Sequence, residues 1–178
     1  GPAHILCAVA HEVCNGEVVA LLGRNGAVKS TTFRSIVGLV EQREGRIVFE
    51  GRDVSAEPTH AIVRSGLGYV PEERRIFTDL TVEENLEVGR QPPRPNAPQW
   101  TRDKLFELFP NLGEMRNRPG GRMSGGEQQM LTIARTLMGN PSLGRLDEPS
   151  EGLSPKIVEH MVEAIMTMKK EGVSIVVS

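Results

Sequence analysis

The sequence predicts an α/β protein built on a parallel β-sheet, and three observations support this fold class. Short apolar runs alternate along the chain with segments whose apolar residues recur at helical spacing. A glycine-rich turn joins an early apolar run to the next helical segment, and an acidic pair directly follows a later apolar run. Parallel strands connected by helices show this alternation, and their ligands bind where the strands end.

Each expected element follows from its own pattern. Short apolar runs predict strands over residues 17–22, 67–70, 143–146 and 173–177. The glycine-bounded run over residues 45–53 predicts an antiparallel edge element. Apolar residues at helical spacing predict helices over residues 30–37, 81–88, 105–109, 124–138 and 156–170. Residues 91–99 are rich in proline and lack periodicity, which predicts a surface loop.

Large side chains in the second half of the chain are interpreted as packing residues. Those of the last helix are expected to pack against the rest of the fold: Ile157, Met161, Val162, Ile165, Met166 and Met168. The single tyrosine and the single tryptophan, Tyr69 and Trp100, are given no role in stacking on a base.

Composition and charge exclude several classes of function. A length of 178 residues suits one domain, and a net charge of -2 gives no electrostatic case for binding nucleic acid. No apolar run approaches the roughly 20 residues that span a bilayer, and no secretory leader opens the sequence. Cys7 and Cys14 are expected to be reduced thiols of a cytoplasmic protein. The histidines have no metal-ligand spacing: His4, His11, His60 and His160.

The glycine-rich turn GRNGAVKSTT, residues 23–32, has the composition of a phosphate-binding loop. Glycines let backbone N–H groups close on phosphates, Lys29 would reach the outer phosphates, and Ser30 supplies a hydroxyl for a metal ion. The pattern departs from G-x-x-x-x-G-K-[ST] because Val28 stands at the second glycine. The expected nucleotide-binding residues are Gly23, Arg24, Asn25, Gly26, Ala27, Val28, Lys29, Ser30 and Thr31.

Two further motifs carry candidate chemistry. MSGGEQQ, residues 123–129, places two glycines at the start of a helix, where backbone donors and the positive end of the helix dipole are exposed. A common helix-entry turn is the alternative interpretation. LDEPSEGL, residues 146–153, places two adjacent carboxylates at the end of a strand, where one can hold magnesium and its neighbour can polarise water. A solvated acidic turn is the alternative there.

In this order the three motifs resemble those of the ATP-binding cassette (ABC) ATPases, from Gly1 to Ser178. GRNGAVKSTT resembles the Walker A loop, MSGGEQQ the signature sequence, and LDEPSEGL the Walker B motif with its D-loop. YVPEERRIF, residues 69–77, resembles the Q-loop region, with Glu72 at the usual glutamine. Together with LTVEENL and SGGEQQM, this pattern is similar to the branched-chain amino-acid importer ATPases, and more narrowly to the sister subunit whose Q-loop carries glutamate. Importers of urea and short-chain amides are the alternative.

The resemblance implies a P-loop ABC ATPase fold: a RecA-like parallel-sheet core, an antiparallel β edge and a helical subdomain near residues 82–121. It implies ATP and Mg²⁺ as ligands, with the metal at Ser30 and Asp147 and with Glu148 as the base that orients the attacking water. Glu72 would sense the γ-phosphate. Four signature residues would bind ATP held by an opposite subunit: Ser124, Gly125, Gly126 and Glu127. Residues 1–178 would form one nucleotide-binding domain, expected to be truncated at both ends.

The implied partners are a membrane permease and a second ABC subunit, identical or a sister, with a periplasmic solute-binding protein involved only indirectly. The implied location is the cytoplasmic face of the bacterial cell membrane. Two other hypotheses remain. One is a structural subunit whose nucleotide binding is impaired by Val28. The other is a cytosolic ABC protein acting on nucleic acid or ribosomes, which the lack of fused cassettes and basic patches disfavours.

Four residues depart from the family pattern. Val28 is expected to strain the loop by about 1–3 kcal/mol and to crowd the phosphates. Gly144 and Arg145 are expected to interrupt the strand before the acidic pair, and a buried arginine would need a partner. His11 lies where an early strand should be apolar.

Overall fold

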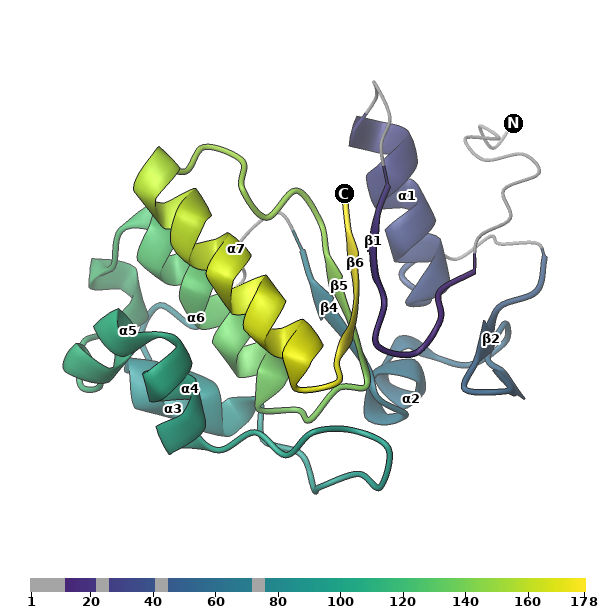
Figure 1. The fold of residues 1–178 in the computed structure, drawn as a ribbon, viewed down its shortest axis with the longest axis horizontal. Helices are drawn as coiled ribbons and strands as arrows, with labels where there is room; N and C mark the ends of the chain where they lie inside the picture. Colours follow the sequence, from purple (N-terminus) through teal and green to yellow (C-terminus); the bar gives the residue numbers. More distant parts are fainter. Residues whose placement is uncertain (1–11, 22–25, 41–44, 72–75) are drawn as a thin grey trace.

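A four-stranded parallel sheet forms the centre of the protein (Figure 1). The computed structural model describes residues 12–21, 26–40, 45–71 and 76–178. The strands lie in the order β1, β6, β5, β4, and all neighbours are parallel. Their bounds are Val18–Ala20 for β1, Leu67–Val70 for β4, Leu143–Leu146 for β5 and Ser174–Val177 for β6. The predicted α/β class and the four predicted parallel strands are confirmed.

Helices cover both faces of this sheet. In Figure 1, α1 (Gly26–Ile36) and α2 (Thr59–Arg64) lie on one side of the strands, and α6 (Gly125–Leu137) and α7 (Pro155–Lys170) lie on the other. The helix predicted from Ser30 begins four residues earlier, at Gly26. Apolar spacing does not reveal this first turn, because its residues are those of the glycine-rich motif rather than core residues. The short α2 was not predicted.

The predicted antiparallel element forms a hairpin outside the parallel sheet. Strands β2 (Val48–Phe49) and β3 (Arg52–Asp53) pair antiparallel as a separate two-stranded sheet. Their tight turn uses Glu50 at φ 49° and Gly51 at φ 77°. Two consecutive residues with positive φ match the twist of the flanking strands, which explains the glycine at this turn.

Residues 76–123 form a helical region that packs beside α6. It contains α3 (Val82–Val88), α4 (Arg102–Leu108), α5 (Pro110–Glu114) and a 3₁₀ turn over Gly120–Arg122. Helices α3 and α4 and the proline-rich loop over residues 91–99 agree with the sequence prediction. The five-residue α5 was not predicted, because so short a helix has no measurable periodicity. That residues 82–121 form a distinct subdomain stays a prediction.

A buried asparagine fastens the start of this helical region. Asn85 is fully buried, and its side-chain amide donates to the carbonyl oxygens of Phe77, Leu80 and Thr81 at 2.9, 3.1 and 2.9 Å. Its oxygen accepts from the Phe77 backbone N–H at 2.9 Å. Because a buried amide left without these partners would be costly, the segment 77–81 is held firmly against α3.

The last helix shows where the packing prediction was wrong. Met161 and Met168 are 3% and 1% exposed, as expected of core residues. Val162 and Met166, however, are 51% and 48% exposed. These two residues lie one turn apart on the same helix, beside the stripe that contacts the sheet. A 16-residue helix buries one stripe, so its neighbouring apolar positions face solvent.

Two cross-strand glycines test how closely helices α6 and α7 pack on the parallel sheet. Gly68 and Gly144 are register partners in β4 and β5. A Cβ on Gly68 would lie 2.8 Å from Cγ2 of Thr136 and 3.1 Å from Cβ of Pro141, whereas a Cβ on Gly144 would meet nothing closer than Cε of Met168 at 3.7 Å. We expect Gly68→Ala to lower the free energy of unfolding by about 1–3 kcal/mol through overpacking.

The control is Gly144→Ala, which should leave the free energy of unfolding unchanged or raise it by up to about 1 kcal/mol, because alanine restricts the unfolded chain. Urea unfolding monitored by circular dichroism measures both variants. Equal destabilisation by the two substitutions would contradict the packing described for α6.

Candidate nucleotide-binding site

The start of α1 and the end of β5 meet at one place, which brings the first and third sequence motifs together. The hydroxyl of Ser30 donates to Oδ1 of Asp147 at 3.0 Å. The ammonium of Lys29 lies 2.8 Å from Oε1 of Glu148. The chain reaches this arrangement because β5 and β1 are parallel, so α1, which follows β1, starts at the edge where β5 ends.

The two adjacent carboxylates lie in different environments. Asp147 is 1% exposed, whereas the side chain of Glu148 is 28% exposed. Glu148 has a backbone φ of 43°, in the left-handed region that non-glycine residues seldom adopt. This turn directs successive side chains differently, so that one carboxylate is enclosed and the other faces solvent. Unusual backbone of this kind is frequent at functional sites.

Further hydroxyl groups surround the enclosed carboxylate. The hydroxyl of Ser178 donates to Oδ1 of Asp147 at 3.0 Å and accepts the backbone N–H of Glu148 at 2.9 Å. The phenol of Tyr69 donates to Oδ2 of Asp147 at 3.3 Å. Both residues lie at strand ends next to β5. Sequence reasoning missed them, because nothing in the residues around them indicates a hydroxyl group that contacts the acidic pair.

The donor set fits a magnesium ion accompanied by a phosphate ligand. Ser30 and Asp147 present adjacent hard oxygen atoms, the type of ligand that Mg²⁺ prefers, and Lys29 supplies a cation beside them. In the described ranges, no group of three or more His, Cys, Asp or Glu side chains gathers to hold a metal. Mg²⁺ typically takes one or two protein ligands and completes its shell with water and substrate phosphates, and the pair of Ser30 and Asp147 suits this preference.

Comparison with known proteins agrees with this geometry. A family model described as ABC transporter matches residues 6–151, which is most of the chain. The chain belongs to the ABC transporter family. It is therefore a nucleotide-binding cassette of the ABC ATPase type, a family that works with membrane permease components.

Two relatives of this cassette cover most of its length. It is 44% identical over 175 residues to the high-affinity branched-chain amino acid transport ATP-binding protein BraG of Pseudomonas aeruginosa, covering 98% of this chain and 75% of BraG. It is 40% identical over 168 residues to the lipopolysaccharide export system ATP-binding protein LptB of Haemophilus influenzae, covering 93% of this chain and 70% of LptB.

Solved ABC structures share the fold of this cassette. A nucleotide-free ATP-binding cassette from an ABC transporter matches with a TM-score of 0.79 at 25% identity, over 97% of this chain and 74% of that one. A dimeric cassette in a post-hydrolysis state bound to ADP and Pi matches with a TM-score of 0.80 at 22% identity, over 97% of this chain and 78% of that one. The second match supports the fold alone.

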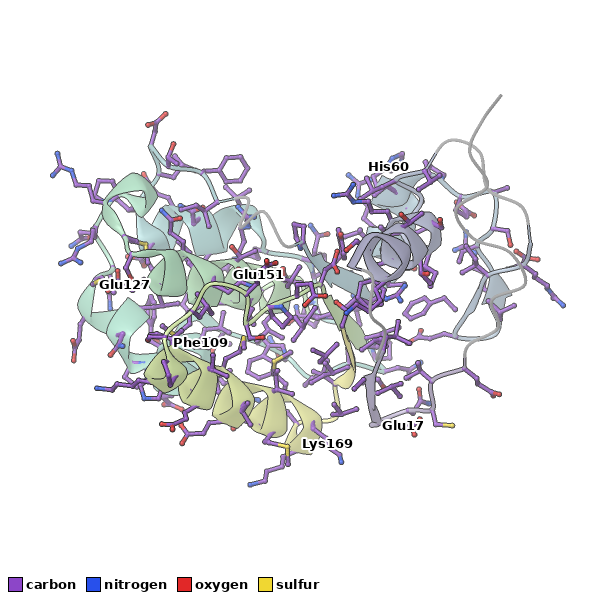
Figure 2. All side chains as sticks on the ribbon, turned by 90° about the horizontal axis from the view of Figure 1, so that it is seen from above. Glu17, His60, Phe109, Glu127, Glu151 and Lys169 are labelled. Carbon is purple, nitrogen blue, oxygen red and sulfur yellow. The ribbon has the colours of Figure 1, made fainter. Side chains whose placement is uncertain are left out.

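The signature segment lies at the start of α6, away from the cassette's own Walker A helix. Ser124 is exposed and caps α6 in a capping box, donating its N–H to Glu127 Oε2 at 2.7 Å and accepting the Glu127 N–H at 3.4 Å. Figure 2 places Glu127 on the side of the molecule opposite α1 and His60. A Cβ on Gly126 would contact Ile157 at 3.0 Å, so this glycine also serves packing against α7.

Several predicted site residues fall outside the described residues. Gly23, Arg24, Asn25 and Glu72 are among them, as is His11. Gly26, Ala27 and Val28 belong to the first turn of α1, but the side chains of the latter two are not among those described. The backbone at Val28 is helical, a conformation that valine adopts without the strain expected from the sequence.

Arg145 is accommodated inside the cassette without a break in β5. Both Gly144 and Arg145 keep their register partners in β4 and β6, so the expected interruption of this strand was wrong. Arg145 is 2% exposed, and its guanidinium lies 4.1 Å from the centre of the Phe33 ring on α1. Burial lowers the pKa of Arg145 to about 10, a shift that the nearby Tyr69 and Asp147 oppose. The arginine therefore remains a cation, stabilised by an aromatic face.

Proposed function

We propose that this cassette binds and hydrolyses ATP to drive a membrane importer, with branched-chain amino acids as the transported solutes. The observation that carries the proposal is the meeting of Lys29 with Glu148 and of Ser30 with Asp147. These four side chains supply a phosphate-binding cation, two metal ligands and a base, the inventory that phosphoryl transfer requires.

The chemistry follows from the positions of these groups. Lys29 and the backbone N–H groups at the start of α1 bind the phosphates, with the helix dipole adding a positive potential. Ser30 and Asp147 would hold Mg²⁺, which when bound neutralises charge on the phosphate oxygens. Glu148 is partly exposed, and it would orient the attacking water and accept its proton.

The ion pair between Lys29 and Glu148 belongs to the resting state in this proposal. The same ammonium cannot serve both a carboxylate and the ATP phosphates at full strength. Arrival of ATP draws Lys29 to the phosphates, which frees Glu148 to accept a hydrogen bond from water. Binding of the nucleotide thus prepares the base for its role.

A complete active site requires a second cassette. Glu127, in the first turn of α6, lies on the side of the molecule opposite α1, which supports a role for this segment toward a nucleotide held by another cassette (Figure 2). Residues 124–127 would close over ATP held by a partner, with their backbone donors and helix dipole directed at its phosphates.

The membrane partner is proposed to contact the helical region, with the cassette attached at the cytoplasmic face. Two large apolar side chains in this region are exposed, Phe77 at 48% and Val88 at 53%. Side chains of this kind are available to contact a partner. None of the helices in the described part of the chain has the length and apolarity of a bilayer-crossing segment.

The identity of the solute rests on the relatives. The 44% identity to BraG supports amino-acid import, and the 40% identity to LptB makes lipopolysaccharide export the second candidate. Selectivity belongs to the permease, so the test must identify that partner. The full-length protein, purified from its native membrane, should carry multi-span permease subunits that drive uptake of radiolabelled leucine into ATP-loaded vesicles. Copurification with lipopolysaccharide-extracting subunits and no uptake would favour export.

A further inference from the structure

The hydroxyl of Tyr69 is a further donor to the carboxylate that Ser30 contacts. It donates to Oδ2 of Asp147 at 3.3 Å, on the side of the carboxylate that Ser30 does not occupy. The hydroxyl of Ser178 also donates to Oδ1, at 3.0 Å.

These contacts join three elements at one carboxylate. Ser30 on α1 and Tyr69 on β4 both donate to the carboxylate of Asp147, at the end of β5. The backbone N–H of Asp147 also donates to the carbonyl of Val70 at 3.0 Å. Oδ1 of this carboxylate accepts from Ser30 and Ser178, and Oδ2 accepts from Tyr69, so donors on both oxygens set the orientation of the carboxylate plane.

A buried cation that can compete for this carboxylate lies beside Tyr69. Arg145 is the register partner of Tyr69, and its Nε and Nη1 atoms are buried without a hydrogen-bond partner in the described part of the chain. A carboxylate released by Tyr69 could turn toward these donors.

We propose that Tyr69 is a positioning residue for the metal–nucleotide site: it holds Oδ2 of Asp147 so that Oδ1 stays beside Ser30, and thereby raises the affinity for a divalent cation. The inference rests on the proposed ATP-binding function. It concerns the orientation of a ligand, because Tyr69 would contact neither the metal nor the phosphates.

The test is Tyr69→Phe in the full-length protein, with a fluorescent ATP analogue bound first in EDTA and then over a series of free Mg²⁺ concentrations. We expect the Mg²⁺ concentration for half-maximal enhancement of binding to rise about tenfold, the lower range for losing a partner of a metal ligand. Binding in EDTA should stay unchanged. Turnover should recover at saturating Mg²⁺, which separates a positioning residue from a catalytic one.

Thr167→Val is the matched control, because it also removes one hydroxyl, from a bond to the Glu163 carbonyl on α7. It should leave the Mg²⁺ dependence unchanged. An unchanged Mg²⁺ dependence in Tyr69→Phe, with a wild-type thermal midpoint, would overturn the inference while the ATPase proposal stands. Equal loss of binding in EDTA and in Mg²⁺ would also overturn it, by indicating general damage. A wild-type protein that binds no analogue would overturn both proposals.

Discussion

Glu148→Gln is expected to lower the turnover of ATP at least about a hundredfold, because an amide cannot accept the proton of the attacking water. The amide keeps the shape of the side chain but removes its charge, so the ion pair with Lys29 at 2.8 Å is lost. The side chain at position 148 then no longer competes with the phosphates for Lys29. We therefore expect the affinity for ATP to rise by up to about fivefold, since a partly exposed ion pair contributes at most about 1 kcal/mol.

The opposite directions of these two effects make the experiment specific. Single-turnover hydrolysis measures the first, and titration of a fluorescent ATP analogue measures the second. Slow turnover with tighter binding should also accumulate ATP-bound dimers, detectable by analytical ultracentrifugation. Glu159→Gln serves as the control, because it removes an exposed carboxylate from α7 and should change neither quantity. Unchanged turnover in Glu148→Gln would remove Glu148 from the mechanism.

Val28→Gly is expected to tighten nucleotide binding by about tenfold or more, through relief of the bulk that valine places beside the phosphates. The substitution has a small cost of its own. Residue 28 belongs to the first turn of α1, where glycine is a poorer helix former than valine by roughly 0.3–0.5 kcal/mol. The variant should therefore bind ATP more tightly while it unfolds at a slightly lower temperature.

This variant also separates an active cassette from a structural subunit with impaired binding. Binding that is weak in the wild type and strong in Val28→Gly would favour the impaired subunit. Strong binding in both proteins would show that the valine is tolerated. Val28→Ala, which removes the branch but keeps a Cβ, should lie between them if bulk is the cause. Weaker binding in Val28→Gly than in the wild type would contradict the steric explanation.

Much of the fold was predictable because its signals are local. The apolar runs that form β4 and β5 are continuous in the chain, and α6 begins where Ser124 and Glu127 complete a capping box. The Walker A motif supplies a cation and a hydroxyl group, the Walker B motif supplies two carboxylates, and a site for metal and phosphate needs all of them. The sequence alone therefore leads us to expect that the two motifs meet. The roles assigned to Glu148 and to residues 124–127 stay predictions.

Local pattern sufficed for the strands, the long helices and the family, because spacing, capping and motif chemistry act within a few residues. The partners of Asp147 needed three dimensions, because Tyr69 and Ser178 reach it from strands that are distant in sequence. The environment of Arg145 also needed three dimensions, because this side chain packs on an aromatic ring of α1 while β5 remains continuous. Exposed Met166 and buried Met168 differ in the same way, since their environment depends on which side of α7 meets the sheet.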